Sequence, residues 1–123
     1  MSLQDLRLKR VYDPVALTDG KRVLVDRLWP RGLSKDKAQV DEWLKEVAPS
    51  PSLRQWFGHN PERFTAFREL YERELGDPVR QNACRQIAQW VNSGPVTLLY
   101  AAKDPVHNHA LILFHAVHEL VME

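Results

Sequence analysis

The sequence lacks several features that would mark a specialised class of protein. It contains one cysteine, Cys84, so it has neither an intrachain disulfide nor a pair of thiols for a metal or redox centre. Its longest apolar run, residues 110–114, is far shorter than the ~18 residues that a membrane-spanning helix needs. The first ten residues hold no apolar signal core. These absences predict a cytoplasmic protein without a membrane partner.

An excess of charge of either sign is also absent. The chain has 17 Lys and Arg against 16 Asp and Glu, a net charge of +1. Such a balance gives no general attraction to nucleic acid or anionic lipid, so binding of either needs a local patch. The 123 residues, 44% of them hydrophobic, are typical of one globular domain. We therefore expect a single α/β domain over residues 1–123.

Apolar patterns predict a mostly parallel sheet. Residues 6–12 alternate between apolar and charged side chains, which indicates an edge strand with one wet face. Residues 22–29 (RVLVDRLW) and 95–102 (PVTLLYAA) are nearly continuous apolar runs, typical of strands covered on both faces. In the first of these runs, Val23 and Val25 should face one layer, and Leu24 and Asp26 the other.

Helix starts share one pattern, a capping side chain directly before a proline. The pattern occurs at Ser50, Asn60, Asp77 and Asp104. Apolar spacing predicts helices over residues 61–75, 78–92 and 105–121, whereas residues 40–47 fit either a short helix or a strand. The predicted fold is a small three-layer α/β domain with helices on the faces of the sheet.

In such a sheet, ligands bind beyond the carboxyl ends of the strands, where residues 26–35 and 103–109 are expected. We take Asp26 and His109 as the candidate catalytic residues. Asp26 is either an acid available as a base or ligand acceptor, or a structural ion pair with Arg27, Arg31 or Lys103. His109 titrates near neutrality and can transfer protons, although a merely solvated or hydrogen-bonded histidine is the alternative.

Six further residues are candidate ligand-binding residues. Arginine forks suit phosphate or carboxylate oxygens, a tryptophan stacks on planar groups, and a serine donates to anions or caps a helix. The alternative for the first loop is a solvated basic segment with a tryptophan that covers the core. The predicted ligand-binding residues are Arg27, Trp29, Arg31, Ser34, Lys103 and Asn108.

The sequence predicts no cofactor and no metal site. His107 and His109 would point ~160° apart on a helix, and no HExxH pattern is present. The spacing of these histidines therefore does not suit the convergent ligands that zinc requires.

Three segments, in order, carry a resemblance to a known family: RVLVDRLWPRGLSK, WLKEVAPSPSLRQWFGH and TLLYAAKDPVHNHA. They resemble the YeaO-like bacterial proteins, part of a broader domain family of unknown function, over about residues 6–120. The resemblance implies a small cytoplasmic α/β protein and assigns no reaction. Longer relatives look similar at Asp26 and Arg27, but tend to show Cys-His-Arg where this chain has Asn108, His109 and Ala110. Chemistry that depends on that cysteine or arginine is therefore not implied here.

These observations favour a protein that binds a small anionic ligand, phosphorylated or nucleotide-like, at the strand carboxyl ends, with or without catalysis. One alternative is a nucleic-acid-binding module that uses a basic and aromatic face. That face would comprise Arg27, Trp29, Arg31, Lys35, Arg54, Trp56 and His59. A second alternative is a non-catalytic partner-binding protein. The sequence leaves the oligomeric state open.

Overall fold

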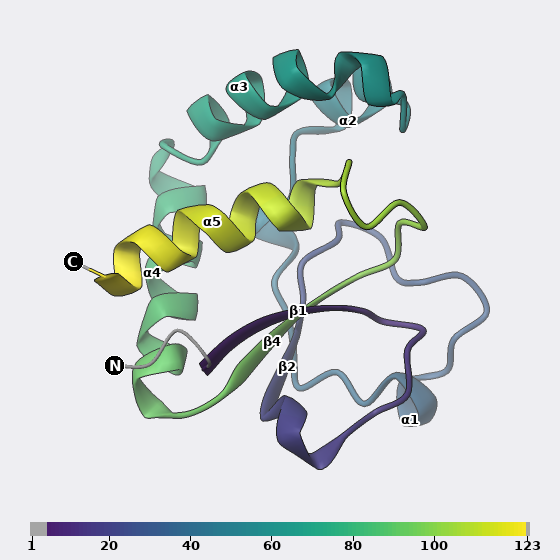
Figure 1. Cartoon of the computed structure of the whole chain (residues 1–123), viewed down its shortest axis with the longest axis vertical. Helices are drawn as coiled ribbons and strands as arrows, with labels where there is room; N and C mark the ends of the chain where they lie inside the picture. Colours follow the sequence, from purple (N-terminus) through teal and green to yellow (C-terminus); the bar gives the residue numbers. More distant parts are fainter. Residues whose placement is uncertain (1–4, 123) are drawn as a thin grey trace.

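A four-stranded parallel sheet lies at the centre of the structure, a computed structural model that describes residues 5–122. The strands are β1 (Leu6–Arg10), β2 (Lys21–Leu24), β3 (Glu42–Trp43) and β4 (Val96–Tyr100). Their order is β1-β4-β2-β3, so β1 and β3 are the edges (Figure 1). The parallel α/β fold and the edge position of the first strand are confirmed.

Five α-helices connect or follow the strands. They are α1 (Lys35–Ala38), α2 (Pro51–Phe57), α3 (Phe64–Glu74), α4 (Pro78–Ser93) and α5 (His109–Met122). Ser50 and Asp77 cap α2 and α4 as predicted, because each side chain accepts a hydrogen bond from a backbone N–H in the first turn. Asn60 instead caps a 3₁₀ turn, Pro61–Arg63, that precedes α3.

The last helix begins one turn later than predicted. It starts at His109, and Asn108 caps it by accepting a 2.9 Å hydrogen bond from the N–H of Leu111. Asp104 closes a turn of its own, accepting from the N–H of His107 at 3.0 Å. The predicted start at residue 105 is wrong because an Asp-Pro pair initiates turns as readily as helices.

The ambiguous segment, residues 40–47, contains a short strand and a turn. Glu42–Trp43 forms β3, which pairs with β2, and Lys45–Val47 forms a 3₁₀ turn. Of the two predicted alternatives for residues 40–47, a short helix or a strand, the strand is therefore confirmed, but only for Glu42 and Trp43.

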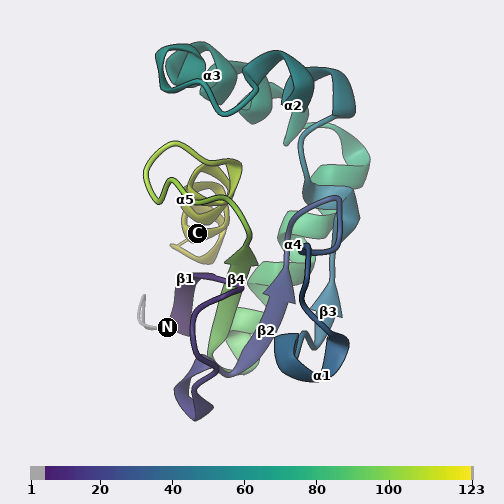
Figure 2. The same ribbon diagram turned by 90° about the vertical axis from the view of Figure 1, so that its right-hand side faces the viewer.

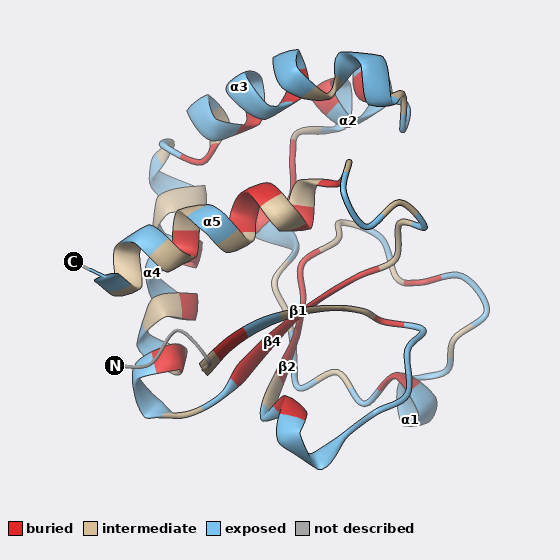
Figure 3. Ribbon diagram, viewed as in Figure 1, coloured by how far each residue is buried: buried red, intermediate tan, exposed pale blue. Residues whose placement is uncertain are grey.

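Helices cover the two faces of the sheet unequally. Val23 and Val25 belong to the large core that α4 and α5 cover, whereas Leu24 packs in a smaller cluster with Ala38 of α1. This alternation is as predicted for Val23, Leu24 and Val25, whereas Asp26, beyond the end of β2, contacts His109 of α5. Figure 2 shows the long α4 on one side of the sheet and the short α1 on the other. β4 is buried along its whole length, as Figure 3 shows.

A buried ion pair lies between the sheet and the short helix α1. The side chains of Arg22 and Asp19 are 4% and 6% exposed, and Nη1 of the arginine lies 2.6 Å from Oδ2 of the aspartate. Arg22 also donates to the carbonyls of Ala38 and Gln39, at 2.9 and 3.0 Å. Lys9 contacts the same carboxylate at 3.1 Å. This network joins β1, β2 and the segment after α1.

Candidate functional site

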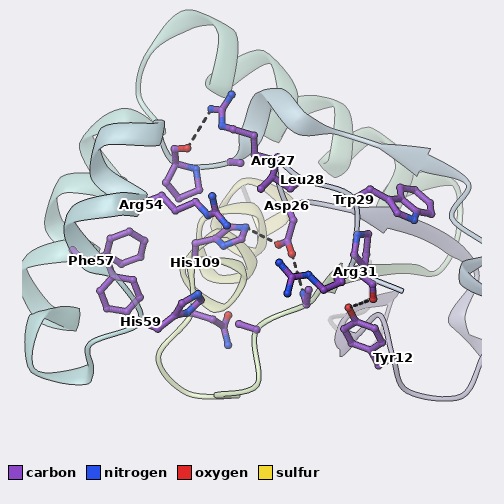
Figure 4. Close-up of a pocket in the computed structure, with 17 residues that line it drawn as sticks. Tyr12, Asp26, Arg27, Leu28, Trp29, Arg31, Arg54, Phe57, His59 and His109 are labelled. Carbon is purple, nitrogen blue, oxygen red and sulfur yellow. Dashed lines mark hydrogen bonds and ion pairs between the residues drawn. The ribbon is translucent and has the colours of Figure 1, made fainter. Parts of the chain in front are cut away.

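A pocket of about 320 Å³ opens where three neighbouring strands end (Figure 4). Tyr12 follows β1, Asp26 follows β2 and Ala101 follows β4, and all three line the pocket. Further walls come from α2 and from the first residue of α5. Because the strands are parallel, their carboxyl ends share one edge, where α/β sheets place their ligands.

The two loops predicted to carry the site meet in this pocket. Arg31 from the first loop and His109 at the end of the second both line it. The other predicted residues that line it are Asp26, Arg27, Trp29 and Asn108.

Ser34 and Lys103 are not among the residues that line this pocket. Ser34 caps α1 by accepting a hydrogen bond from the N–H of Lys37. Lys103 is exposed in the loop after β4. The structure therefore separates these two predicted ligand-binding residues from the rest.

The tautomer of His109 is set by its neighbours. Nε2 lies 3.0 Å from the carbonyl oxygen of Val25 and 3.4 Å from Oδ1 of Asp26. Both neighbours are acceptors, so Nε2 carries the hydrogen. Burial lowers the pKa of His109, and the nearby Arg54 and His59 lower it further, against the opposing effect of Asp26. The ring is therefore neutral at physiological pH.

The second ring nitrogen of His109 is left for the pocket. His109 lines the pocket, and its Nδ1 forms no hydrogen bond with any group in residues 5–122 and is not among the fully buried unpaired atoms of that part of the chain. With the hydrogen on Nε2, a neutral ring presents Nδ1 as an acceptor. The ring of Tyr71 packs edge-on at 5.9 Å and helps to hold this orientation.

The carboxylate of Asp26 contacts other parts of the protein through both oxygens. Its Oδ2 accepts a 2.9 Å hydrogen bond from the N–H of Ala101, which ties the end of β2 to the end of β4. Its Oδ1 is buried and lies 3.4 Å from Nε2 of His109. The predicted pairing of Asp26 with Arg27, Arg31 or Lys103 is not what the structure has, because the carboxylate points toward the histidine instead.

Three arginines line the pocket: Arg27, Arg31 and Arg54. Arg27 donates from Nη2 to the carbonyl of Pro49 at 3.2 Å, and its buried Nε has no partner within residues 5–122. Arg31 and Arg54 are exposed and have no ion-pair partner in that part of the chain (Figure 4). Asp26 is the one acidic residue among those that line the pocket in the described chain. The pocket therefore has a positive excess.

The polar groups of two predicted ligand-binding residues form hydrogen bonds within the protein. The indole N–H of Trp29 donates to the carbonyl of Leu33 at 2.6 Å, and its ring packs edge-on against Trp43. Asn108 is 2% exposed, caps α5 and donates to the carbonyl of Asp104 at 2.8 Å. Both line the pocket without a free polar group in the described chain.

Some pocket residues were missed, or assigned elsewhere, at the level of sequence. The sequence indicates Arg54 only as part of the basic and aromatic face, and no motif in the sequence points to Tyr12 as a pocket residue. Phe57 and Phe67, stacked at 4.2 Å, form an apolar wall. Arg54 precedes Phe57 by three residues, a spacing that puts both on one side of a helix and would have indicated a shared pocket.

The proposed basic and aromatic face is not continuous. Trp56 lies outside the pocket, in a separate groove between α2 and α3, where Arg63 covers its ring at 5.3 Å. Lys35, in α1, is likewise not among the pocket residues.

Two further findings concern other classes of site. Residues 5–122 contain no group of three His, Cys, Asp or Glu placed to hold a metal ion. Over the same residues, none of the helices combines the length and apolar character that crossing a bilayer requires.

Comparisons with known proteins place these features in a family context. A family model described as the inactive DUF488-N3 subclade, DUF488-N3i, matches residues 5–123. Uncharacterized protein YeaO of Escherichia coli K12 is 44% identical over 109 residues, which cover 89% of this chain and 93% of the relative. Uncharacterized protein Rv3073c of Mycobacterium tuberculosis H37Rv is 41% identical over 108 residues, 88% of this chain and 89% of the relative. No solved structure matches the chain.

Proposed function

The chain belongs to the DUF488-N3i family, the inactive DUF488-N3 subclade, and on this premise we propose that it binds a small phosphorylated or nucleotide-like anion without turning it over. One observation carries the proposal: Arg27, Arg31 and Arg54 line one pocket whose single carboxylate, Asp26, is already engaged. Guanidinium groups match phosphate oxygens in geometry and charge. At about 320 Å³, the pocket suits a small ligand.

Binding without chemistry agrees with the residues that flank His109. Asn108 and Ala110 stand where longer relatives tend to show cysteine and arginine. Asn108 is a helix cap, and Ala110 is buried and apolar, so neither supplies a nucleophile or a cation. The description of the subclade as inactive supports the same reading.

Calorimetric titration with inorganic phosphate tests the proposal. Arg54→Ala should weaken phosphate binding by about tenfold, the loss expected for one charge-assisted hydrogen bond. The Arg54 side chain makes no hydrogen bond or ion pair within residues 5–122, and the variant keeps the backbone bonds of α2 to Ser50 and Gly58, so it should keep the fold. Arg85→Ala is the matched control, because Arg85 is exposed on α4 and does not line the pocket.

Two results would overturn the proposal. One is a wild-type dissociation constant for phosphate weaker than about 1 mM at low salt, with AMP binding no better. The other is an equal loss of affinity in Arg54→Ala and Arg85→Ala, which would mean that phosphate senses the general surface charge and not the pocket.

A further inference from the structure

The free ring nitrogen of His109 gives the pocket a hydrogen-bond acceptor among donors. We propose that this nitrogen selects oxyanions that carry an O–H or N–H donor beside their charged oxygens, and disfavours donor-free oxyanions of the same shape. Hydrogenphosphate is the smallest member of the favoured class, and sulfate is its donor-free counterpart. The inference rests on the proposed function and names the chemistry of its ligand.

The first step concerns the side of the ring that faces the protein. Nε2 of His109 donates to the carbonyl of Val25 at 3.0 Å, with Oδ1 of Asp26 at 3.4 Å. Neither neighbour can donate, so the opposite tautomer would set an Nε2 lone pair against two acceptors. The hydrogen is therefore fixed on Nε2.

The second step concerns the charge of the ring. Burial opposes protonation of His109 most strongly, Asp26 and the carbonyl of Val25 favour it, and Arg54 and His59, near α2, oppose it, so that the pKa of His109 is lowered. Tyr71 of α3 contributes a neutral ring edge at 5.9 Å. With a neutral ring and a hydrogen on Nε2, Nδ1 can only accept.

The third step concerns the rest of the pocket. The charged side chains that line it beside His109 are Arg27, Arg31 and Arg54, which only donate, and Asp26, whose Oδ2 is bonded and whose Oδ1 is buried. A second histidine, His59, also lines the pocket, so His59→Phe is the control that separates its ring from that of His109. An anion held by the arginines therefore meets Nδ1 with one of its oxygens. An O–H group of the anion can donate a hydrogen bond to Nδ1, whereas an oxygen without hydrogen would place its lone pair against that of Nδ1 and be repelled.

Competing titrations with sodium phosphate and sodium sulfate, at equal ionic strength and about pH 8, test the inference. At that pH the histidine is neutral, phosphate retains a P–O–H group and sulfate has none. Wild-type protein should prefer phosphate by about tenfold or more. His109→Phe keeps a flat ring against Tyr71 but removes Nδ1, so it should bind the two anions with a ratio near one.

A second measurement needs no variant. The pKa of His109 is lowered by burial, so the titration should be followed on the ring itself by NMR as the pH falls. As the ring protonates, Nδ1 becomes a donor, so sulfate affinity should rise and the preference for phosphate should shrink. Equal wild-type affinities for the two anions at about pH 8, or a sulfate affinity that does not change as the His109 ring protonates, overturn the inference while leaving the proposed function in place. Failure of both anions to bind overturns the proposed function itself.

Discussion

Removal of Arg22 tests the account of the buried network under α1. In Arg22→Met the side chain keeps much of its length and loses every donor. Asp19 then retains Lys9 at 3.1 Å but loses its 2.6 Å contact, and the carbonyls of Ala38 and Gln39 lose their partners. Breaking a buried pair from one side costs about 3–5 kcal/mol. We expect Arg22→Met to lower the free energy of unfolding by about 3 kcal/mol, the lower end of this range, because Lys9 still neutralises the carboxylate.

Urea denaturation of two variants separates the parts of this loss. Asp19→Asn combined with Arg22→Met removes both charges, so the double variant should be more stable than Arg22→Met alone. A loss below about 1 kcal/mol in Arg22→Met, or a double variant no more stable than that single one, would refute the reasoning. Phosphate binding should not change in either variant, since neither residue lines the pocket.

The same network predicts an acid dependence. Burial by itself raises the pKa of Asp19, but hydrogen bonds from the N–H of Ala16, from Lys9 and from Arg22 outweigh it and hold that pKa below its usual value. The folded protein is therefore stabilised by the ionised Asp19 at pH values above the unfolded pKa of about 3.9, and it loses this stabilisation as the pH falls through the lower folded value. Asp19→Asn should flatten this acid limb of a stability-against-pH curve, and an unchanged limb would contradict the assignment.

Other substitutions and reactions follow from local geometry. Gly20→Ala should destabilise the protein more than Gly32→Ala, although both glycines have positive φ, because a Cβ at Gly20 would lie 2.2 Å from the carbonyl oxygen of Pro95. The space around Gly32 is open, so Gly32→Ala should lower the free energy of unfolding by only about 1 kcal/mol. Equal melting temperatures for the two variants would contradict this. Asn108→Ala should cost about 1 kcal/mol in urea denaturation through loss of the α5 cap, and no change would contradict that cap. Burial, and then a nearby carboxylate, raise the pKa of Cys84 to about 11, so the native thiol should resist iodoacetamide until unfolding, and rapid native labelling would contradict its burial.

Much of the site's location was predictable from the strand pattern. Asp26 lies within one apolar run, near the end of a predicted strand, and His109 follows the other run by seven residues, and parallel neighbours end at a common edge. Parallel pairing of the two strands is enough to bring the loops that follow them together, so Arg31 and His109 were predictable neighbours. The orientation of their side chains depends on tertiary contacts, which the strand pattern does not specify.

The misplaced details depend on tertiary contacts that a single sequence does not encode locally. Asp104 and Asn108 are both good caps, and only the packing of α5 decides which one serves. The pattern around Trp29 fits a stacking platform as well as a core residue, and the choice depends on Trp43, which arrives from β3. Arg54 reaches the pocket because α2 lies across the strand ends, an arrangement fixed by aromatic packing with α3.

The position of β4 has a consequence for biosynthesis. This strand lies between β1 and β2, yet the ribosome adds residues 96–100 long after it has added either of them. The first two strands cannot pair with each other, so they have no hydrogen-bonded neighbour in common until β4 emerges from the exit tunnel. In the nascent chain, β1 therefore waits for its sheet partner until α2, α3 and α4 have been made, a period in which such a segment is exposed to misassociation.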